Sequence, residues 1–172
     1  MINLLILVVE TNSKTKSDDK YISSFIKRFY NISGIKYDFV YMDGKGNYAN
    51  VLPKVDKMRT KNKSLSSEVI YFIDVDYSAD ASKNTQSINL NKQIAQFTKN
   101  HNFDLVQFNY DIEDVFLGKQ ISDSDKERES TKFLCNNSIN NVNESFFTVK
   151  NPATCRHRSN LSLVLDKYLP KK

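Results

Sequence analysis

Two aspartates, Asp74 and Asp76, follow the apolar run Val69–Ile73 in the stretch EVIYFIDVDYS. Residues two positions apart on an extended chain point to the same face, so the run predicts a buried strand that ends in two adjacent carboxylates. Like charges this close repel, and burying them costs free energy unless a positive group lies between them. The pair therefore indicates a site for a cation.

Further carboxylates follow other apolar runs of the same kind. Glu10 closes the run Ile2–Val9, and Glu113 follows the run FDLVQFNY. In open α/β sheets, ligands bind beyond the carboxyl ends of the strands. Clusters of carboxylate oxygens are the ligands that Mg²⁺ and Mn²⁺ prefer. If the strands are neighbours, we expect Glu10, Asp74 and Asp76 to hold one of these ions.

The same acids also fit ordinary structural roles. An isolated Asp-x-Asp at a strand end is more often a surface or capping feature than a metal site. Asp111, Glu113 and Asp114 match the first turn of a helix, where the helix dipole favours acids. The metal hypothesis therefore depends on several acids following different strands together.

The next candidates are basic side chains that would contact nucleic-acid phosphates: Lys45, Lys119, Arg156 and Arg158. Gly44 and Gly46 flank Lys45 and could form an amide nest for phosphate, although a plain tight turn is the favoured interpretation of the two glycines. Arg156 and Arg158 flank His157, and a solvated basic helix face is the simpler interpretation of that stretch. Four basic residues follow Glu113 and could supply the positive charge that a phosphoryl-transfer site needs: Lys119, Lys126, Arg128 and Lys132.

Alternating strand and helix patterns position these residues. The expected strands are Ile2–Val9, Ile35–Met42, Leu65–Ile73 and Phe103–Tyr110, with a short strand at Phe146–Val149. The expected helices are Ser17–Ile32, Tyr48–Arg59, Ser87–His101, Asp111–Lys119, Asp123–Leu134 and Asn151–Leu169. Such alternation predicts an α/β fold with a mainly parallel sheet of about four to five strands, flanked by helices on both faces.

Length and composition favour one globular domain over residues 1–172. Apolar residues make up 40% and charged residues 26%, which excludes a disordered chain. The net charge of +5 and the pI near 9.1 permit a polyanionic partner. Cys135 and Cys155 form no CxxC motif, which is typical of a reduced, cytoplasmic protein. The first apolar run is too short to span a membrane and lacks a basic start, so we expect no membrane partner.

The order of these motifs resembles the Toprim fold of topoisomerases, primases, OLD-family nucleases and small nucleases of defence loci. The matching stretches are LLILVVE, DGKGNY, VIYFIDVD and FNYDIEDVF, and they cover most of the chain. The chain is most similar to RloB-like proteins and to the Toprim effectors of PARIS-type anti-phage systems. The closing stretch NPATCRHRSNLSLVLDKYL also resembles the C-terminal helix of RloB-like chains.

This resemblance implies a nuclease that hydrolyses phosphodiesters of DNA or RNA with Mg²⁺ or Mn²⁺, in bacterial anti-phage defence beside an ATPase partner. It makes Glu10 the general acid or base or a metal ligand, Asp74 and Asp76 metal ligands, and Glu113 a further acidic residue of the site. The chain departs from the family at Thr11, where the family has glycine, and this hinders close approach of the backbone to a phosphate.

Two other functions stay open. The first is a catalytically inactive Toprim-like interaction module of a defence or mobile-element locus, in which the change at Thr11 has removed activity. The second is a receiver-like signalling domain that binds Mg²⁺. A receiver-like site needs a pair of acids after the first strand, whereas only Glu10 follows that strand here.

Overall fold

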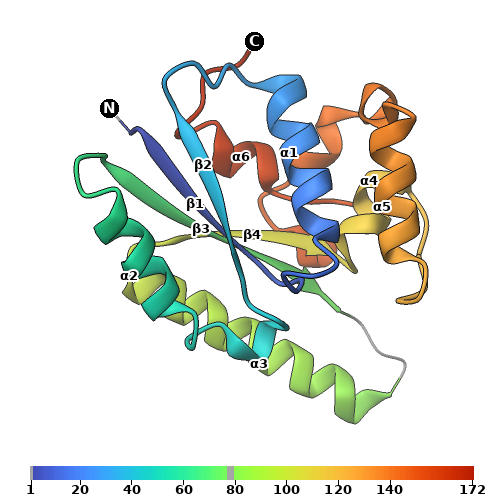
Figure 1. The fold of residues 1–172 in the computed structure, drawn as a ribbon. Helices are drawn as coiled ribbons and strands as arrows, with labels where there is room; N and C mark the ends of the chain where they lie inside the picture. The colour runs from blue at the N-terminus through green and yellow to red at the C-terminus, as the bar shows by residue number, and fades with distance from the viewer. Residues whose placement is uncertain (1, 77–79) are drawn as a thin grey trace.

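The computed structural model describes residues 2–76 and 80–172 and contains a sheet of four parallel strands (Figure 1). The strands are β1 Leu4–Val9, β2 Lys36–Tyr41, β3 Ser67–Val75 and β4 Asp104–Asn109. Their order in the sheet is β2-β1-β3-β4, so the first and third strands of the chain are neighbours at its centre. The predicted α/β class and parallel sheet are confirmed, and this architecture is consistent with a Toprim-like fold.

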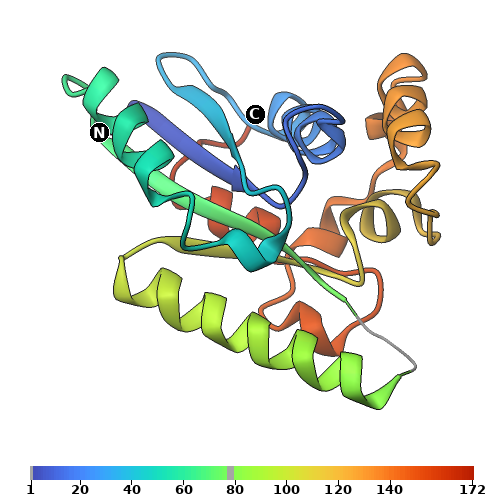
Figure 2. The ribbon, with the colours of Figure 1, turned by 60° about the horizontal axis from the view of Figure 1, so that its bottom comes forward.

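Helices cover both faces of the sheet (Figures 1 and 2). One face carries α1 Ser17–Phe29, α4 Ile112–Leu117, α5 Lys126–Cys135 and α6 Leu161–Leu165, and the other carries α2 Leu52–Lys61 and α3 Ala81–Asn100. Alternate residues of β1 contribute to the two resulting cores, and every residue of the strand is buried. Burial on both faces explains why β1 appears in the sequence as an unbroken apolar run.

The first helix packs through a row of aromatic and aliphatic side chains at helical spacing. Tyr21 and Phe25 are fully buried, and their rings lie 4.8 Å from Phe133 and 4.6 Å from Phe147, respectively. Aromatic contacts of this kind add to the free energy gained by burying apolar area. They fix α1 with its N-terminal residues, from Ser17 on, beside the carboxyl ends of the strands (Figure 1).

A tight turn after β2 brings a lysine to the same edge of the sheet. Gly44 has φ of 100°, which L side chains rarely adopt, and its N–H donates to the carbonyl of Glu10 at 2.9 Å. A 3₁₀ helix, Lys45–Asn47, follows immediately. The tight-turn interpretation of the two glycines is therefore confirmed, and the turn fixes the position of Lys45.

The sequence-based boundaries are wrong in the C-terminal region. The stretch predicted as a strand at Phe146–Val149 overlaps a 3₁₀ helix, Glu144–Phe147. The predicted last helix, Asn151–Leu169, contains only a 3₁₀ helix, Pro152–Thr154, and the short α6. Long-range hydrogen bonds compete with the helix here, because Arg158 accepts from the N–H of Asn109 at 2.9 Å and Ser159 donates to Phe146 at 2.8 Å.

The long helix α3 also differs from its prediction. It begins at Ala81, six residues before the predicted start at Ser87, because the Asp80 side chain caps it by accepting from the N–H groups of Ser82 and Lys83. The pattern of apolar residues in the predicted helix places Ile88 on its inward face, but the side chain is 39% exposed in the structure. Among the described residues, no helix combines the length and apolar character needed to cross a membrane.

Candidate metal centre

The carboxyl ends of β1 and β3 bring Glu10 and Asp74 together. Val9 pairs with Phe72 in the register of the two strands, so Glu10 emerges beside the end of β3. Its Oε2 accepts a hydrogen bond from the backbone N–H of Asp74 at 3.2 Å. The expectation that these acids meet at one edge of a parallel sheet is confirmed for this pair.

Lys45 supplies the positive charge next to the aspartates. Its Nζ lies 2.5 Å from Oδ2 of Asp76 and donates to the backbone carbonyl of Asp74 at 2.9 Å. Lys45 is only 8% exposed, whereas Asp76 lies beyond the end of β3 and is exposed. An ammonium group therefore neutralises Asp76 and ties the turn after β2 to the end of β3.

Two further acids, Asp18 and Glu113, complete an acidic cluster with Glu10 and Asp74. Oδ2 of Asp18 accepts from the N–H of Thr11 at 3.1 Å, and Oδ1 accepts from the hydroxyl of Ser17 at 3.1 Å. Glu113 is fully buried. We call Glu10, Asp18, Asp74 and Glu113 the acid cluster.

Lys126 is the counterion of Glu113. Its Nζ lies 3.6 Å from Oε2 of Glu113, 3.7 Å from Oδ2 of Asp111 and 3.6 Å from Oδ1 of Asp123. None of these separations is short enough for a strong hydrogen bond. Neither carboxylate oxygen of Glu113 accepts a well-formed hydrogen bond from the described residues. A buried carboxylate in this state is costly unless it binds a proton or a cation.

Burial raises the pKa of every member of the acid cluster. The pKa of Glu10 rises to about 7, with Lys45 opposing the shift and Asp76 adding to it. Burial also raises the pKa of Asp18 to about 6 and that of Glu113 to about 7. For Asp74, burial and then the charge of Glu10 raise the pKa well above its usual range. The cluster therefore retains protons near neutral pH, and a cation would replace them.

The donor chemistry of the acid cluster fits a divalent cation, because carboxylate oxygens are in excess and those of Glu113 lack hydrogen-bond donors. The arrangement of the ligands is less complete. Within residues 2–76 and 80–172, no three potential ligands surround one point closely enough to hold a metal. Glu10 and Asp74 are the pair that would hold the cation, with Asp18 and Glu113 behind them, since Asp76 is already paired with Lys45.

An open cleft of about 780 Å³ lies in front of Glu10. The loop Thr11–Lys14, the turn at Asp43 and Gly44, and Asp123 form its other walls. It lies beyond the carboxyl ends of the strands, which is where ligands bind in sheets of this kind. Glu10 is thus the member of the acid cluster that a substrate entering the cleft would meet.

The basic residues predicted to contact nucleic acid lie in different places. Lys45 is buried against Asp76, and Lys119 is exposed with its Nζ 3.3 Å from Oε2 of Glu129. The guanidinium of Arg156 lies 5.7 Å from the centre of the Tyr110 ring, and that of Arg158 lies 3.9 Å from the Phe146 ring. The structure therefore does not gather these four residues into one surface.

Asp111 and Asp114 have structural roles in α4. Asp111 is the N-cap, and its Oδ1 accepts from the N–H of Asp114 at 2.7 Å. The buried carboxylate of Asp114 lies 2.8 Å from Nδ1 of His157. The interpretation of these acids as the first turn of a helix is confirmed, and the same turn places Glu113 in the acid cluster.

Sequence reasoning missed Asp18, because an acid in the first turn of a helix is explained by the helix dipole alone. Lys126 was predicted only as one of four basic residues after Glu113. The available signal for Asp18 was its place in the first helical turn after Glu10. Lys126 has no comparable signal, because only the packing of α5 on α1 brings it to this edge.

No protein-family model matches this chain, and a search of the curated proteins found no match either.

Proposed function

We propose that this chain is a Toprim-type phosphodiesterase that cuts DNA or RNA with Mg²⁺ or Mn²⁺. The observation that carries the proposal is the acid cluster, with Glu113 fully buried and the other three acids partly buried, beside an open cleft at the carboxyl edge of a parallel sheet. Acids outnumber lysines there, so the cluster alone would repel a polyanion, and only a bound cation inverts the local field.

Glu10 would have a different role in each state of the site. In the metal-free protein its pKa of about 7 lies near neutral pH, so the carboxyl group can accept and donate a proton. Its contact with the Asp74 N–H fixes the carboxylate at the cleft. With a cation present, Asp74 and Glu10 would be its ligands, and the cation would keep both carboxylates ionised. When bound, a divalent cation stabilises charge on phosphoryl oxygens and lowers the pKa of water.

Cleavage of labelled single-stranded and double-stranded DNA and RNA tests this function. We expect cleavage with Mn²⁺ or Mg²⁺ that stops with chelator, and loss of cleavage in Glu10→Gln and Asp74→Asn. Asp56→Asn on α2 is the matched control, since it removes an exposed carboxylate on the other face of the sheet. Metal-dependent cleavage that survives in both cluster variants would refute the assignment.

A non-catalytic interaction module is the second candidate. The pairing of Lys45 with Asp76 and the incomplete ligand arrangement favour it, as does Thr11 in place of the family glycine. A folded protein that neither cleaves nucleic acid nor gains stability from Mn²⁺ would select this candidate. A receiver-like domain has less support, because Glu10 is not followed directly by a second acid at the end of β1; labelling of an aspartate by an acyl phosphate would favour it.

The resemblance to defence nucleases carries the cellular part of the proposal. We expect the chain to act in the cytoplasm of a bacterium, in a locus that also encodes an ATPase partner. Co-expression with a neighbouring ATPase followed by size-exclusion chromatography tests this expectation. Separate elution of the two chains, with and without nucleotide, would remove the partner from the proposal.

A further inference from the structure

A second surface, away from the acid cluster, carries the charge that a nucleic acid needs. An open groove of about 500 Å³ lies between α1 and α5. Its α1 side presents Lys20, Lys27 and Arg28, and its α5 side presents Leu134. We call this surface the basic groove.

The positive charges of the basic groove are not neutralised by neighbouring acids. Within residues 2–76 and 80–172, no carboxylate forms an ion pair with Lys20, Lys27 or Arg28. Nζ of Lys20 donates only to neutral hydroxyls, those of Ser130 and Thr131. Unpaired cations lining one concavity create a positive potential that attracts anions.

One carboxylate lines the basic groove, but it is directed elsewhere. Oδ2 of Asp19 accepts a hydrogen bond from the hydroxyl of Tyr41 on β2 at 2.7 Å. The hydroxyl of Ser23 lies between the cations along α1 and is the kind of neutral donor that contacts phosphate oxygens, whereas the hydroxyl of Ser24 donates to the backbone carbonyl of Lys20 at 2.7 Å. The groove therefore combines net positive charge with hydrogen-bonding groups.

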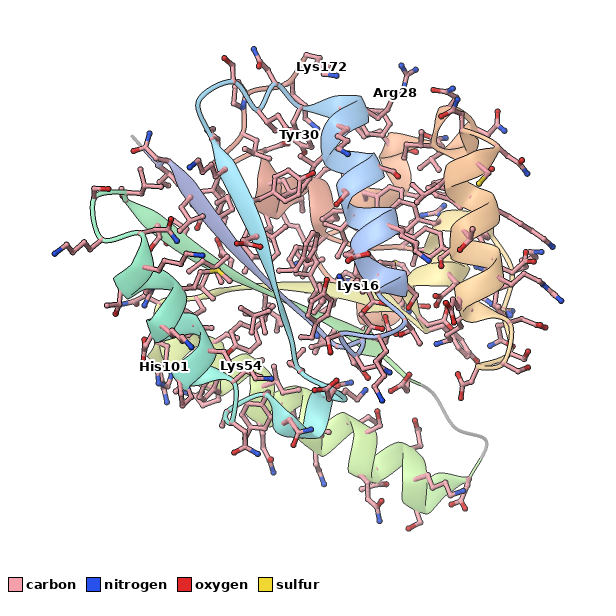
Figure 3. The ribbon with its side chains drawn as sticks, in the orientation of Figure 1. Lys16, Arg28, Tyr30, Lys54, His101 and Lys172 are labelled. Carbon is pink, nitrogen blue, oxygen red and sulfur yellow. The ribbon has the colours of Figure 1, made fainter. Side chains whose placement is uncertain are left out.

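The length of the basic groove fits a short stretch of a nucleic-acid strand. Lys20 and Lys27 are seven residues apart on α1, and a helix rises 1.5 Å per residue, so roughly 10 Å separates them along the axis. A strand that lies along α1 could therefore place phosphates near both lysines. Figure 3 shows Lys16 and Arg28 at opposite ends of α1, with Lys172 near the Arg28 end.

The apolar side of the groove favours single strands. Leu134 is 43% exposed, which is unusual for a large apolar side chain in this chain. Proteins that bind single strands combine a positively charged groove for the backbone with aromatic side chains that stack on unstacked bases, and Leu134 offers apolar contact area to such bases without a ring. A duplex keeps its bases stacked and has no use for such a surface.

We infer that the basic groove binds the sugar–phosphate backbone of single-stranded nucleic acid, through Lys20, Lys27 and Arg28. That this binding serves cleavage rests on the proposed function. The basic groove begins at Asp19, the residue that follows Asp18 of the acid cluster. Binding itself needs neither the metal nor the acids. The basic groove would hold one part of a strand while a neighbouring part of the same strand enters the cleft beside Glu10.

Fluorescence anisotropy with a short labelled single strand in chelator tests the inference. The test variant is Lys27→Gln/Arg28→Gln, both at exposed positions. The matched control is Lys57→Gln/Lys61→Gln on α2, which removes the same charge from the opposite face. We expect the groove variant to bind roughly tenfold more weakly at about 0.1 M salt, and its salt slope to fall by about 1.4, or 0.7 for each lost phosphate contact.

Several results would overturn the inference: equal weakening by both double variants, unchanged binding by the groove variant, or equal dependence of duplex and single-strand binding on Lys27 and Arg28. Loss of binding to polyglutamate but not to the oligonucleotide would assign the groove to an acidic protein instead. Binding in chelator without any cleavage in Mn²⁺ would refute the proposed function alone. If a groove variant cleaves nucleic acid and binds single strands normally, the binding role of the basic groove is refuted and the proposed function stands.

Discussion

Acidification of the metal-free protein from about pH 8 to about pH 5.5 should stabilise the fold, which is the reverse of ordinary acid denaturation. Glu10 has an ordinary pKa of 4.5 and a pKa of about 7 in the folded chain. Between these values the folded state binds more protons than the unfolded state, so stability falls as the pH rises through about 7 and is highest below 4.5. Burial of the carboxyl group is the main cause.

The size of the stabilisation is worked out for the uptake of one proton, because the members of the acid cluster titrate together. From pH 7 down to about pH 5.5 the folded state gains roughly 1.4 kcal/mol for each pH unit, which gives about 2 kcal/mol. For a domain of this size, 2 kcal/mol raises the melting temperature by roughly 4 to 8 °C. Asp18 and Glu113 have raised pKa values as well and change stability in the same direction.

Thermal melts in chelator at several pH values measure this effect. Glu10→Gln should reduce the pH dependence without removing it, because Asp18 and Glu113 still take up protons, whereas Asp56→Asn on α2 should leave it unchanged. A His157→Gln background removes the imidazole beside Asp114 from the comparison. A melting temperature of the parent chain that falls or stays level on acidification would refute the reasoning, as would a full pH dependence in Glu10→Gln.

Two further predictions concern the cations of the site. Mn²⁺ at a hundredfold excess over its Kd should stabilise the parent chain by about 2.7 kcal/mol and raise its melting temperature by roughly 5 °C or more. Mn²⁺ should reach this effect at a lower concentration than Mg²⁺. An equal rise of the melting temperature in Asp74→Asn would mean that the cation binds elsewhere. Lys45→Met should lower the free energy of unfolding in urea by about 1 to 3 kcal/mol, because the ammonium bonded to Asp74 and Asp76 is lost. A loss no greater than that of Lys57→Met would contradict the stabilising role of these Lys45 contacts.

The strands and the meeting of Glu10 with Asp74 could be predicted because each depends on a local pattern. Apolar runs identify strands that are buried on both faces, and acids directly after two such strands meet wherever the strands are neighbours. The partner of Asp76 could not be predicted in the same way. Lys45 lies on a different connection, and only the conformation of Gly44 brings its ammonium to the end of β3.

The C-terminal region shows a second limit of sequence patterns. Apolar positions near Leu161 and Leu165 repeat at helical spacing, and α6 forms there. Before them, the segment around Ser159 exchanges backbone hydrogen bonds with Phe146 and Val149, and the side chain of Asn109 donates to the carbonyl of Pro152 at 2.8 Å. Hydrogen-bond partners so distant in sequence leave no periodic signal, so the sequence pattern predicted a helix that begins ten residues too early, at Asn151 instead of Leu161.

The position of Lys45 removes Asp76 from the expected metal ligands but leaves Glu10 and Asp74. The Nζ of Lys45 contacts the Asp76 carboxylate directly and neutralises its charge. The second ammonium near the acid cluster is that of Lys126, at 3.6 Å from Glu113. Two ammonium groups cannot balance the four carboxylates of the acid cluster together with Asp76, so at neutral pH the remainder must bind protons or a cation. We therefore expect a divalent ion to compete with protons at Glu10 and Asp74, and Asp76 to matter least of the three predicted ligands.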